Sequence, residues 1–258
     1  MIGIDYEDEF LWNEVPQGVG IVMVDFSLPM DQMQRLKELS EDQFVWIDHH
    51  KTAIDKAREA GFETPGLRVV GKAACELTWE FFYPREPMPT AVWLLGRYDV
   101  WDDKNPSWDS DILPFQYGLR KEVTDPANPE TAGGWGALFA DKSLTQGFIE
   151  EGRAIIKYQR QQDAKLMARH GFHTHLDGIA ALAVNHGPGG SMKFEGELEV
   201  VKTFLLLISF ARLPQRKWLV NLYTYREDVD CGEIARCHGG GGHRKAAGFI
   251  CEELPFEI

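Results

Sequence analysis

Two short apolar runs near the start of the chain predict buried β-strands. Residues 20–24 end directly before Asp25, and residues 44–47 end directly before Asp48. Between them, residues 31–39 carry apolar side chains at helical spacing among charged ones, which predicts an amphipathic helix. The order strand, helix, strand predicts a parallel sheet with helices on its faces.

The same alternation continues through the first half of the chain. Residues 73–82 predict a helix that Pro84 stops, and residues 91–98 predict another. Residues 101–135 are rich in Pro, Asp, Asn and Gly, so we expect them to be irregular. The predicted fold class is therefore α/β, with a Rossmann-like parallel sheet in the first domain.

A long amphipathic stretch, residues 144–169, predicts a helix that joins two domains. After it, three apolar runs predict a smaller α/β domain, with the last two runs forming a hairpin: 179–184, 203–210 and 217–225. A short helix is expected over 230–237, capped by Asp228 or Asp230. We expect the first domain to span residues 1–142, the linker helix 143–175 and the second domain 176–258.

Charge and hydropathy narrow the function. The formal net charge of −13 would repel a long nucleic-acid duplex, yet it is compatible with a small phosphate substrate drawn to bound metal ions. No apolar run approaches the ~20 residues that cross a bilayer, so no contact with a membrane is expected. The four cysteines form no close pair, and the N-terminal residues do not resemble an export signal. These features favour a cytoplasmic protein with reduced thiols.

The candidate chemistry begins at the two strand ends. In open α/β sheets, ligands collect at the carboxyl ends of the strands, where Asp25 and Asp48 stand. Asp48 is followed by His49 and His50, and carboxylate with imidazole suits Mn²⁺, Fe²⁺, Co²⁺ or Zn²⁺. We expect one histidine to bind metal, the other to meet a phosphate, and Asp48 to orient an imidazole. The alternatives are a polar corner at Asp48 and a helix cap at Asp25.

Two further segments carry candidate residues. Asp99 ends an apolar helix, where the helix dipole disfavours negative charge and a cation would balance it. The glycine run 239–242 can turn its backbone N–H groups toward an anion, and His243, Arg244 and Lys245 add donors. The alternatives are a solvated acidic loop and a flexible glycine loop.

Other cysteines, histidines and tryptophans have weaker interpretations. A zinc cluster is one alternative, although its spacing fits no standard zinc motif: Cys231, Cys237, His238 and His243. Three histidines in the link are expected to be solvated: His170, His173 and His175. Three tryptophans in predicted loops could stack on a base, and the sequence favours none of them: Trp12, Trp108 and Trp135.

Four segments together resemble the DHH phosphoesterase superfamily, in the family's order and over nearly the whole chain: residues 22–27 (VMVDFS), 45–52 (VWIDHHKT), 97–99 (RYD) and 239–249 (GGGGHRKAAGF). The branch that the chain resembles most is the nano-RNase and oligoribonuclease type with a DHH-associated C-terminal domain. The resemblance implies two domains and a two-metal site, usually occupied by Mn²⁺.

The resemblance also implies residue roles. Asp25 would bridge both metals, and His49 and Asp99 would complete one metal site. Asp48 and His50 would be catalytic, with His50 contacting the scissile phosphate. His243, with the backbone of Gly240, Gly241 and Gly242, would hold the far end of the substrate, and Arg244 would contact it as well.

One departure from the family pattern affects the expected activity. We expect the family's first strand, first helix and histidine–aspartate motif to be absent, either because the sequence is a truncated product or because it is a natural short form, and Asp5 and Asp8 do not match that motif. One metal site would then be incomplete, and the sheet would expose apolar surface that a second copy of the chain could cover. The expected function is hydrolysis of short oligonucleotides to nucleoside monophosphates. The alternatives are a phosphatase for 3′-phosphoadenosine 5′-phosphate or for (cyclic) dinucleotides, and a nucleotide-binding protein with impaired catalysis.

Overall fold

A computed structural model describes residues 2–4, 8–122, 125, 128–187, 190–191, 193–194 and 203–258. The chain forms two compact units, an N-terminal unit (Met1–Ile155) and a C-terminal unit (Ile156–Ile258). The division falls within one long helix, α7 (Lys142–His170). Asp5 lies outside the described residues.

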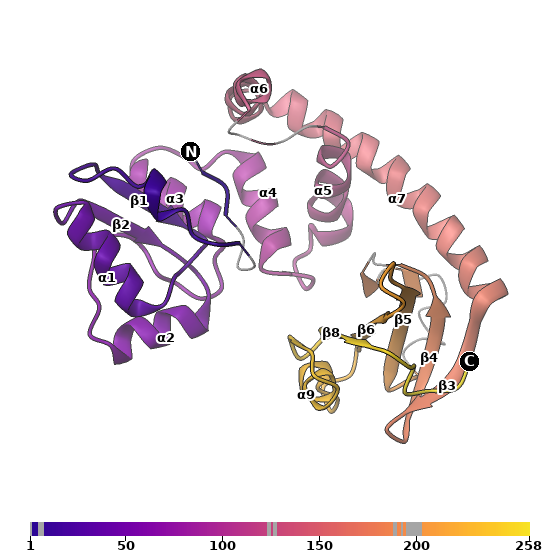
Figure 1. The fold of residues 1–258 in the computed structure, drawn as a ribbon. Helices are drawn as coiled ribbons and strands as arrows, with labels where there is room; N and C mark the ends of the chain where they lie inside the picture. The colour runs from indigo at the N-terminus through magenta and orange to yellow at the C-terminus, as the bar shows by residue number, and fades with distance from the viewer. Residues whose placement is uncertain are drawn as a thin grey trace. The chain divides into compact units, whose positions relative to one another are not determined.

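A two-stranded parallel sheet organises the N-terminal unit. β1 (Ile21–Val24) pairs in parallel with β2 (Phe44–Ile47), and α1 (Met30–Leu39) connects them (Figure 1). Met33 and Leu36 of α1 lie three residues apart and pack against Phe44 and Trp46 of β2, which are completely buried. The α/β class and both predicted strands are confirmed.

One expectation about this sheet is wrong. β1 is only half buried, because its side chains alternate between two faces. Met23 faces the core, whereas Val22 and Val24 are 51% and 37% exposed.

Helices surround the sheet, and most of them follow the sequence pattern. The helices predicted over 31–39, 73–82 and 91–98 are confirmed as α1, α3 (Ala74–Phe82) and α4 (Thr90–Asp99). The helix α2 (Lys51–Glu59), which begins directly after His50, was not predicted. Its buried face consists of two alanines, which give a weak apolar signal.

The expectation of irregular structure over 101–135 is wrong for residues 108–119 and 129–135, which are helical, whereas 101–107 and 120–122 are irregular. η2 (Trp108–Ile112) is a π-helical turn within this region, and η1 (Trp12–Glu14) is a short 3₁₀ turn near the N-terminus. η2 leads into α5 (Leu113–Leu119), and α6 (Pro129–Ala140) follows. Trp108, Ile112 and Phe115 are buried here, so local apolar packing overrides the Pro- and Asp-rich composition.

The long helix is confirmed, but the linker is shorter than expected. α7 ends at His170 rather than continuing to residue 175, and Gly171 begins β3 (Gly171–Leu176). His173 and His175 are exposed on this strand, so they are solvated as expected but are not linker residues.

A six-stranded sheet forms the C-terminal unit. Its strands are ordered β3-β4-β5-β6-β8-β7, and only the neighbours β4 and β5 run in parallel. The remaining strands are β4 (Ile179–Asn185), β5 (Leu206–Arg212), β6 (Trp218–Tyr223), β7 (Gly241–Gly242) and β8 (Ala246–Cys251). The predicted strand at 179–184 and the β5–β6 hairpin are confirmed.

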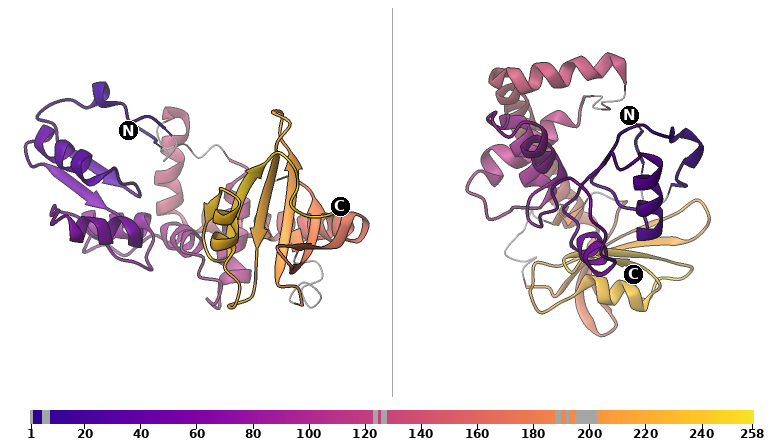
Figure 2. Two further views of the ribbon diagram at one scale, coloured as in Figure 1. Left: turned by 60° about the horizontal axis from the view of Figure 1, so that its bottom comes forward. Right: turned by 90° about the vertical axis from the view of Figure 1, so that its left-hand side faces the viewer.

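Two helices cover opposite faces of this sheet (Figure 2). α9 (Cys231–Cys237) packs on the face that carries Ile208 and Phe210, and the end of α7 packs on the face that carries Leu207. The side chain of Asp230 accepts a hydrogen bond from Glu233 N at 3.0 Å, which confirms the predicted helix cap. Among the described residues, no helix is both long and apolar enough to span a bilayer.

Candidate active site

The two strand-end aspartates are brought together by the parallel pairing of β1 and β2. Val24 pairs with Ile47, so the residues that follow them leave the sheet side by side. The backbone N–H of Asp25 still donates to Ile47 O at 3.0 Å. Asp25 then adopts φ +60°, a left-handed conformation that aspartate tolerates better than most residues.

Asp48 shapes the corner that carries both histidines. It is completely buried, and its Oδ1 accepts the backbone N–H groups of His49 at 2.7 Å and His50 at 3.0 Å. The same oxygen lies 2.8 Å from Nδ1 of the His50 ring. An ionised carboxylate only accepts, so His50 carries its proton on Nδ1 and leaves Nε2 without a proton while the ring is neutral.

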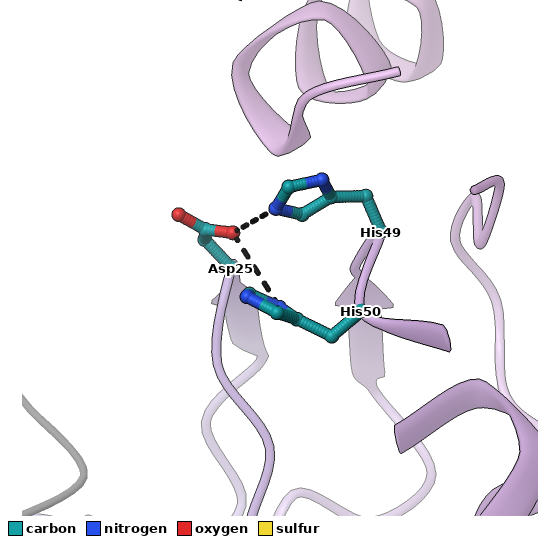
Figure 3. Close-up of side chains that lie close together, drawn as sticks. All are labelled: Asp25, His49 and His50. Atoms are coloured by element: carbon teal, nitrogen blue, oxygen red, sulfur yellow. Dashed lines mark ion pairs between the residues drawn. The ribbon is translucent and has the colours of Figure 1, made fainter. Parts of the chain in front are cut away.

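His49 lies where two carboxylates converge. Its Nε2 is 3.0 Å from Oδ1 of Asp25 and 3.4 Å from Oδ2 of Asp99. Figure 3 shows Asp25 reaching from the end of β1 toward both imidazole rings, and His50 Nδ1 lies 3.8 Å from the same Asp25 oxygen. One ring N–H can be shared by two carboxylates only imperfectly, whereas a cation bound near His49 would be attracted by both carboxylates.

Two of the donor pairs have separations that a shared divalent ion would give. Two donors that each lie about 2.1 Å from one ion are about 3.0 Å apart at octahedral angles and about 3.4 Å apart at tetrahedral angles. The His49 separations of 3.0 and 3.4 Å match both values. Among the described residues, Asp25, His49 and His50 are the only group of three metal-binding side chains whose donor atoms converge. Asp99 is not a member of this group, but its Oδ2 lies 3.4 Å from Nε2 of His49, which is.

The electrostatics of the site also favour a cation. Burial, followed by the negative charge of Asp99, raises the pKa of Asp25 above its ordinary value, and His49 and His50 oppose that rise. Asp99 is the last residue of α4, where the helix dipole also disfavours negative charge. A bound cation would relieve both costs.

A buried ion pair that the sequence did not reveal joins α3 to α4 close to Asp99 in the chain. Glu76 of α3 is 4% exposed and pairs with Arg97 of α4, two residues before Asp99. Glu76 also accepts from Ala73 N at 2.9 Å, and Arg97 reaches Asp102 at 3.6 Å. The pair joins helices that are separated by a loop, so no local spacing could have indicated it.

The glycine-rich segment lies in the C-terminal unit, and packing explains much of its composition. A Cβ on Gly240 would lie 2.1 Å from the carbonyl oxygen of Gly248, so α9 and β8 can approach only if this residue is glycine. A Cβ on Gly241 would meet nothing within 4 Å. Gly242 pairs with Ala247 across the β7–β8 ladder.

The cationic residues next to this segment differ in their contacts. The side chain of Arg244 is held by Glu227 O at 2.6 Å and by Asp230 at 3.6 Å. His243 is exposed, and its backbone pairs with Ala246. His243 is therefore the side chain of this segment best placed to receive an anion from solvent.

The zinc alternative is not formed in the described residues. Cys231 is completely buried in the core of the C-terminal unit. His238 lies 2.8 Å from Asp177 and stacks on Phe249. Cys237 and His243 are exposed and belong to no converging group of ligands in the described part of the chain.

No family model matches the chain. An uncharacterized protein, R106, of Acanthamoeba polyphaga mimivirus is 23% identical over 252 residues, which cover 92% of this chain and 55% of that protein. The chain therefore spans about half the length of the curated relative that it matches.

Solved structures that the chain resembles include a pGpG-specific phosphodiesterase, PggH, from Vibrio cholerae. It is 11% identical with a TM-score of 0.46, and the match covers 88% of this chain and 83% of that one. An exopolyphosphatase-related protein from Bacteroides fragilis is 13% identical with a TM-score of 0.40, over 90% and 66% of the two chains. A DHH domain from a member of a family of ribosomal proteins is 14% identical with a TM-score of 0.42, over 89% and 65%.

Proposed function

We propose that this chain is a divalent-metal-dependent phosphoesterase of the DHH type. The observation that carries the proposal is the convergence of the Asp25 and Asp99 carboxylates on Nε2 of His49. A divalent ion bound there, Mn²⁺ by resemblance to the family, would act as a Lewis acid on a phosphate oxygen and lower the pKa of a bound water.

The protein groups around this position have distinct roles in the proposal. Asp25, His49 and Asp99 bind the metal. His50 is proposed to contact the scissile phosphate through Nε2, because Asp48 occupies Nδ1 at 2.8 Å, and it donates to the phosphate when the ring carries a second proton on Nε2. Asp48 is a positioning residue, since it is buried and acts on the site through His50 and the backbone of His49. Because Asp48 is buried, water does not compete for its hydrogen bonds to His49 and His50.

We propose short oligonucleotides as the substrate, with release of nucleoside monophosphates. His243, Arg244 and the backbone of Gly240, Gly241 and Gly242 are proposed to bind a phosphate that is not cleaved. A phosphatase for 3′-phosphoadenosine 5′-phosphate or for dinucleotides would use the same metal ligands.

The test is a substrate panel with the purified chain and Mn²⁺. It compares RNA dimers to pentamers, pGpG, 3′-phosphoadenosine 5′-phosphate and a cyclic dinucleotide, with mononucleotide or phosphate release as the readout. We expect turnover of at least one of them, and its loss in His49→Gln. His173→Gln is the matched control, because His173 is exposed on β3 in the other unit. Nucleotide binding without turnover under any divalent metal would favour a binding protein instead.

A further inference from the structure

The residue that terminates α4 is unusual for its position. The helix ends in a Schellman motif, in which Trp101 N donates to Tyr98 O at 3.0 Å and Asp102 N donates to Arg97 O at 3.0 Å. This geometry requires a left-handed residue at the turn, and Trp101 takes φ +52°. Glycine is the usual residue there, because a side chain at positive φ is strained.

Among the described helices, two of the three others that end in the motif have the expected glycine. α2 and α9 end in the same motif with Gly61 at φ +64° and Gly239 at φ +79°. α1 ends in it with Glu41 at φ +52°. A bulky aromatic residue at this position is a backbone outlier, and such outliers concentrate at functional sites.

Burial does not account for the tryptophan. The Trp101 side chain is 47% exposed. Its ring contacts Tyr98 at a centroid distance of 5.6 Å and Trp108 at 5.0 Å, both edge to face. These contacts hold the indole in a fixed orientation while much of it remains open to solvent. A rigid, exposed aromatic ring is the feature that stacks on another planar ring.

The guanidinium of Arg120 adds a positive charge to the aromatic cluster formed by Tyr98, Trp101 and Trp108. The Arg120 guanidinium lies 5.5 Å from the centre of the Tyr98 ring and donates to the Tyr98 hydroxyl at 3.1 Å. Arg120 is exposed, and in the part of the chain that the structure describes it forms no ion pair with a carboxylate. This is notable because the N-terminal unit has 28 acidic and only 14 basic residues. Such a guanidinium beside an exposed indole suits a ligand that is both aromatic and anionic.

The cluster adjoins the candidate metal site through the chain itself. Trp101 follows Asp99 by two residues, so their Cα atoms lie within about 7 Å of each other. We propose that Trp101 stacks on a nucleobase of the substrate and that Arg120 binds one of its uncleaved phosphates. This inference rests on the proposed function. Stacking by Trp101 would favour nucleotides over substrates without a base, such as polyphosphate.

The test compares two ligands that differ only in the base. Binding of adenosine 5′-monophosphate and of ribose 5-phosphate is measured by calorimetry with Mn²⁺ present. The wild-type chain is expected to bind the nucleotide about tenfold more tightly, the preference expected of one base–aromatic stack. Trp101→Gly should remove that preference and leave ribose 5-phosphate unchanged. Trp101→Phe should retain most of it, because it keeps a ring.

The controls separate stacking from folding. Trp101→Gly introduces the residue that the motif favours, so the variant is expected to fold, and its melting temperature is checked. Glu41→Gly makes the same backbone change at the same motif position of α1 and should leave both affinities unchanged. Arg120→Gln should lower the affinity for both ligands about equally, because both carry the phosphate.

The outcomes separate this inference from the proposed function. The stacking role is overturned if the wild-type chain binds the two ligands with equal affinity. It is also overturned if Trp101→Gly lowers the affinity for both ligands equally, even if oligonucleotides are hydrolysed. A base preference that depends on Trp101, combined with no turnover of any oligonucleotide, upholds the stacking role and removes the proposed reaction.

Discussion

The Nε2 atom of His49 lies 3.0 Å from Oδ1 of Asp25, although the two residues follow different strands. They meet because β1 and β2 run in parallel and end at the same edge of their sheet. The same proximity has an electrostatic cost, since burial and the charge of Asp99 raise the pKa of Asp25. Without a cation, the folded protein therefore disfavours the ionised form of Asp25, and stability and function should oppose each other there.

Replacing Asp25 by asparagine tests this opposition. A raised pKa means that the folded state disfavours the ionised carboxylate, so Asp25→Asn should increase the free energy of unfolding of the metal-free protein at neutral pH. The gain should fade as the pH falls below about 4, where the carboxyl is protonated in both states. Asparagine also tolerates φ +60°. Chemical denaturation with a chelator at pH 7 and pH 3.5 measures the difference.

The control for that substitution is Asp42→Asn. Asp42 also has positive φ, at +64°, but it is exposed and belongs to no converging group of ligands found among the described residues. It should change stability little, because a surface ion pair such as Lys37–Asp42 contributes at most about 1 kcal/mol. Added Mn²⁺ should stabilise the wild type and Asp42→Asn but not Asp25→Asn. Equal stabilisation of all three proteins by Mn²⁺ would exclude Asp25 as a ligand.

The two adjacent histidines should separate metal binding from phosphate contact. His49→Gln should weaken Mn²⁺ binding at least tenfold, because its Nε2 faces both carboxylates. His50→Gln should leave Mn²⁺ affinity within a few-fold and lower turnover about a hundredfold, since Asp48 holds Nδ1 and leaves Nε2 for the phosphate. Mn²⁺ titration by electron paramagnetic resonance and steady-state assays give the two values. Identical effects on metal affinity would contradict the division of roles.

The sequence predicted the parts of this site that depend on local pattern. β2 and Asp48 were found because a fully apolar run ends at a charged residue, and α4 was found by its helical spacing. The helix α2 was missed because Ala53 and Ala57 barely distinguish its buried face. β3 was missed because polar residues, two of them histidines, alternate with its buried positions. Tertiary contacts such as Glu76–Arg97 depend on how distant helices pack, which no local pattern contains.

Removing the carboxylate of Glu76 should affect both stability and the metal site. Glu76→Gln leaves the Arg97 guanidinium without its buried partner, and breaking such a pair costs about 3 kcal/mol of unfolding free energy. Asp99 follows Arg97 by two residues, so Mn²⁺ affinity should fall as well. Glu80→Gln on the same helix is the control, because its pair with Lys72 is partly exposed and should contribute less than about 1 kcal/mol. Urea denaturation of both variants measures whether the buried pair contributes more unfolding free energy than the partly exposed one.

Two neighbouring glycines of the C-terminal unit should respond differently to alanine. Gly240→Ala places a methyl group 2.1 Å from Gly248 O, so we expect a loss of about 2 kcal/mol or more from overpacking. Gly241→Ala meets nothing within 4 Å, so its stability should stay within about 1 kcal/mol of the wild type. Thermal unfolding distinguishes them. Reduced binding of inorganic phosphate by a stable Gly241→Ala would support anion binding by this segment, and equal destabilisation of both variants would contradict the packing explanation.

The buried thiol of Cys231 should make stability fall at alkaline pH. Burial, followed by the charge of Asp230, raises the pKa of Cys231 to about 12. An unfolded thiol titrates near 8.5, so between about pH 8.5 and 12 the unfolded chain releases a proton that the folded chain retains. The free energy of unfolding should therefore fall with pH, by at most about 1.4 kcal/mol per pH unit from this group.

Cys231→Ala removes this contribution, so the stability advantage of the wild type over that variant should shrink between pH 8 and pH 10. Cys237→Ala, at an exposed position, should run parallel to the wild type over the same range. Urea denaturation under reducing conditions measures all three proteins, and a pH-independent difference between the wild type and Cys231→Ala would show that Cys231 ionises as readily in the folded chain as in the unfolded one.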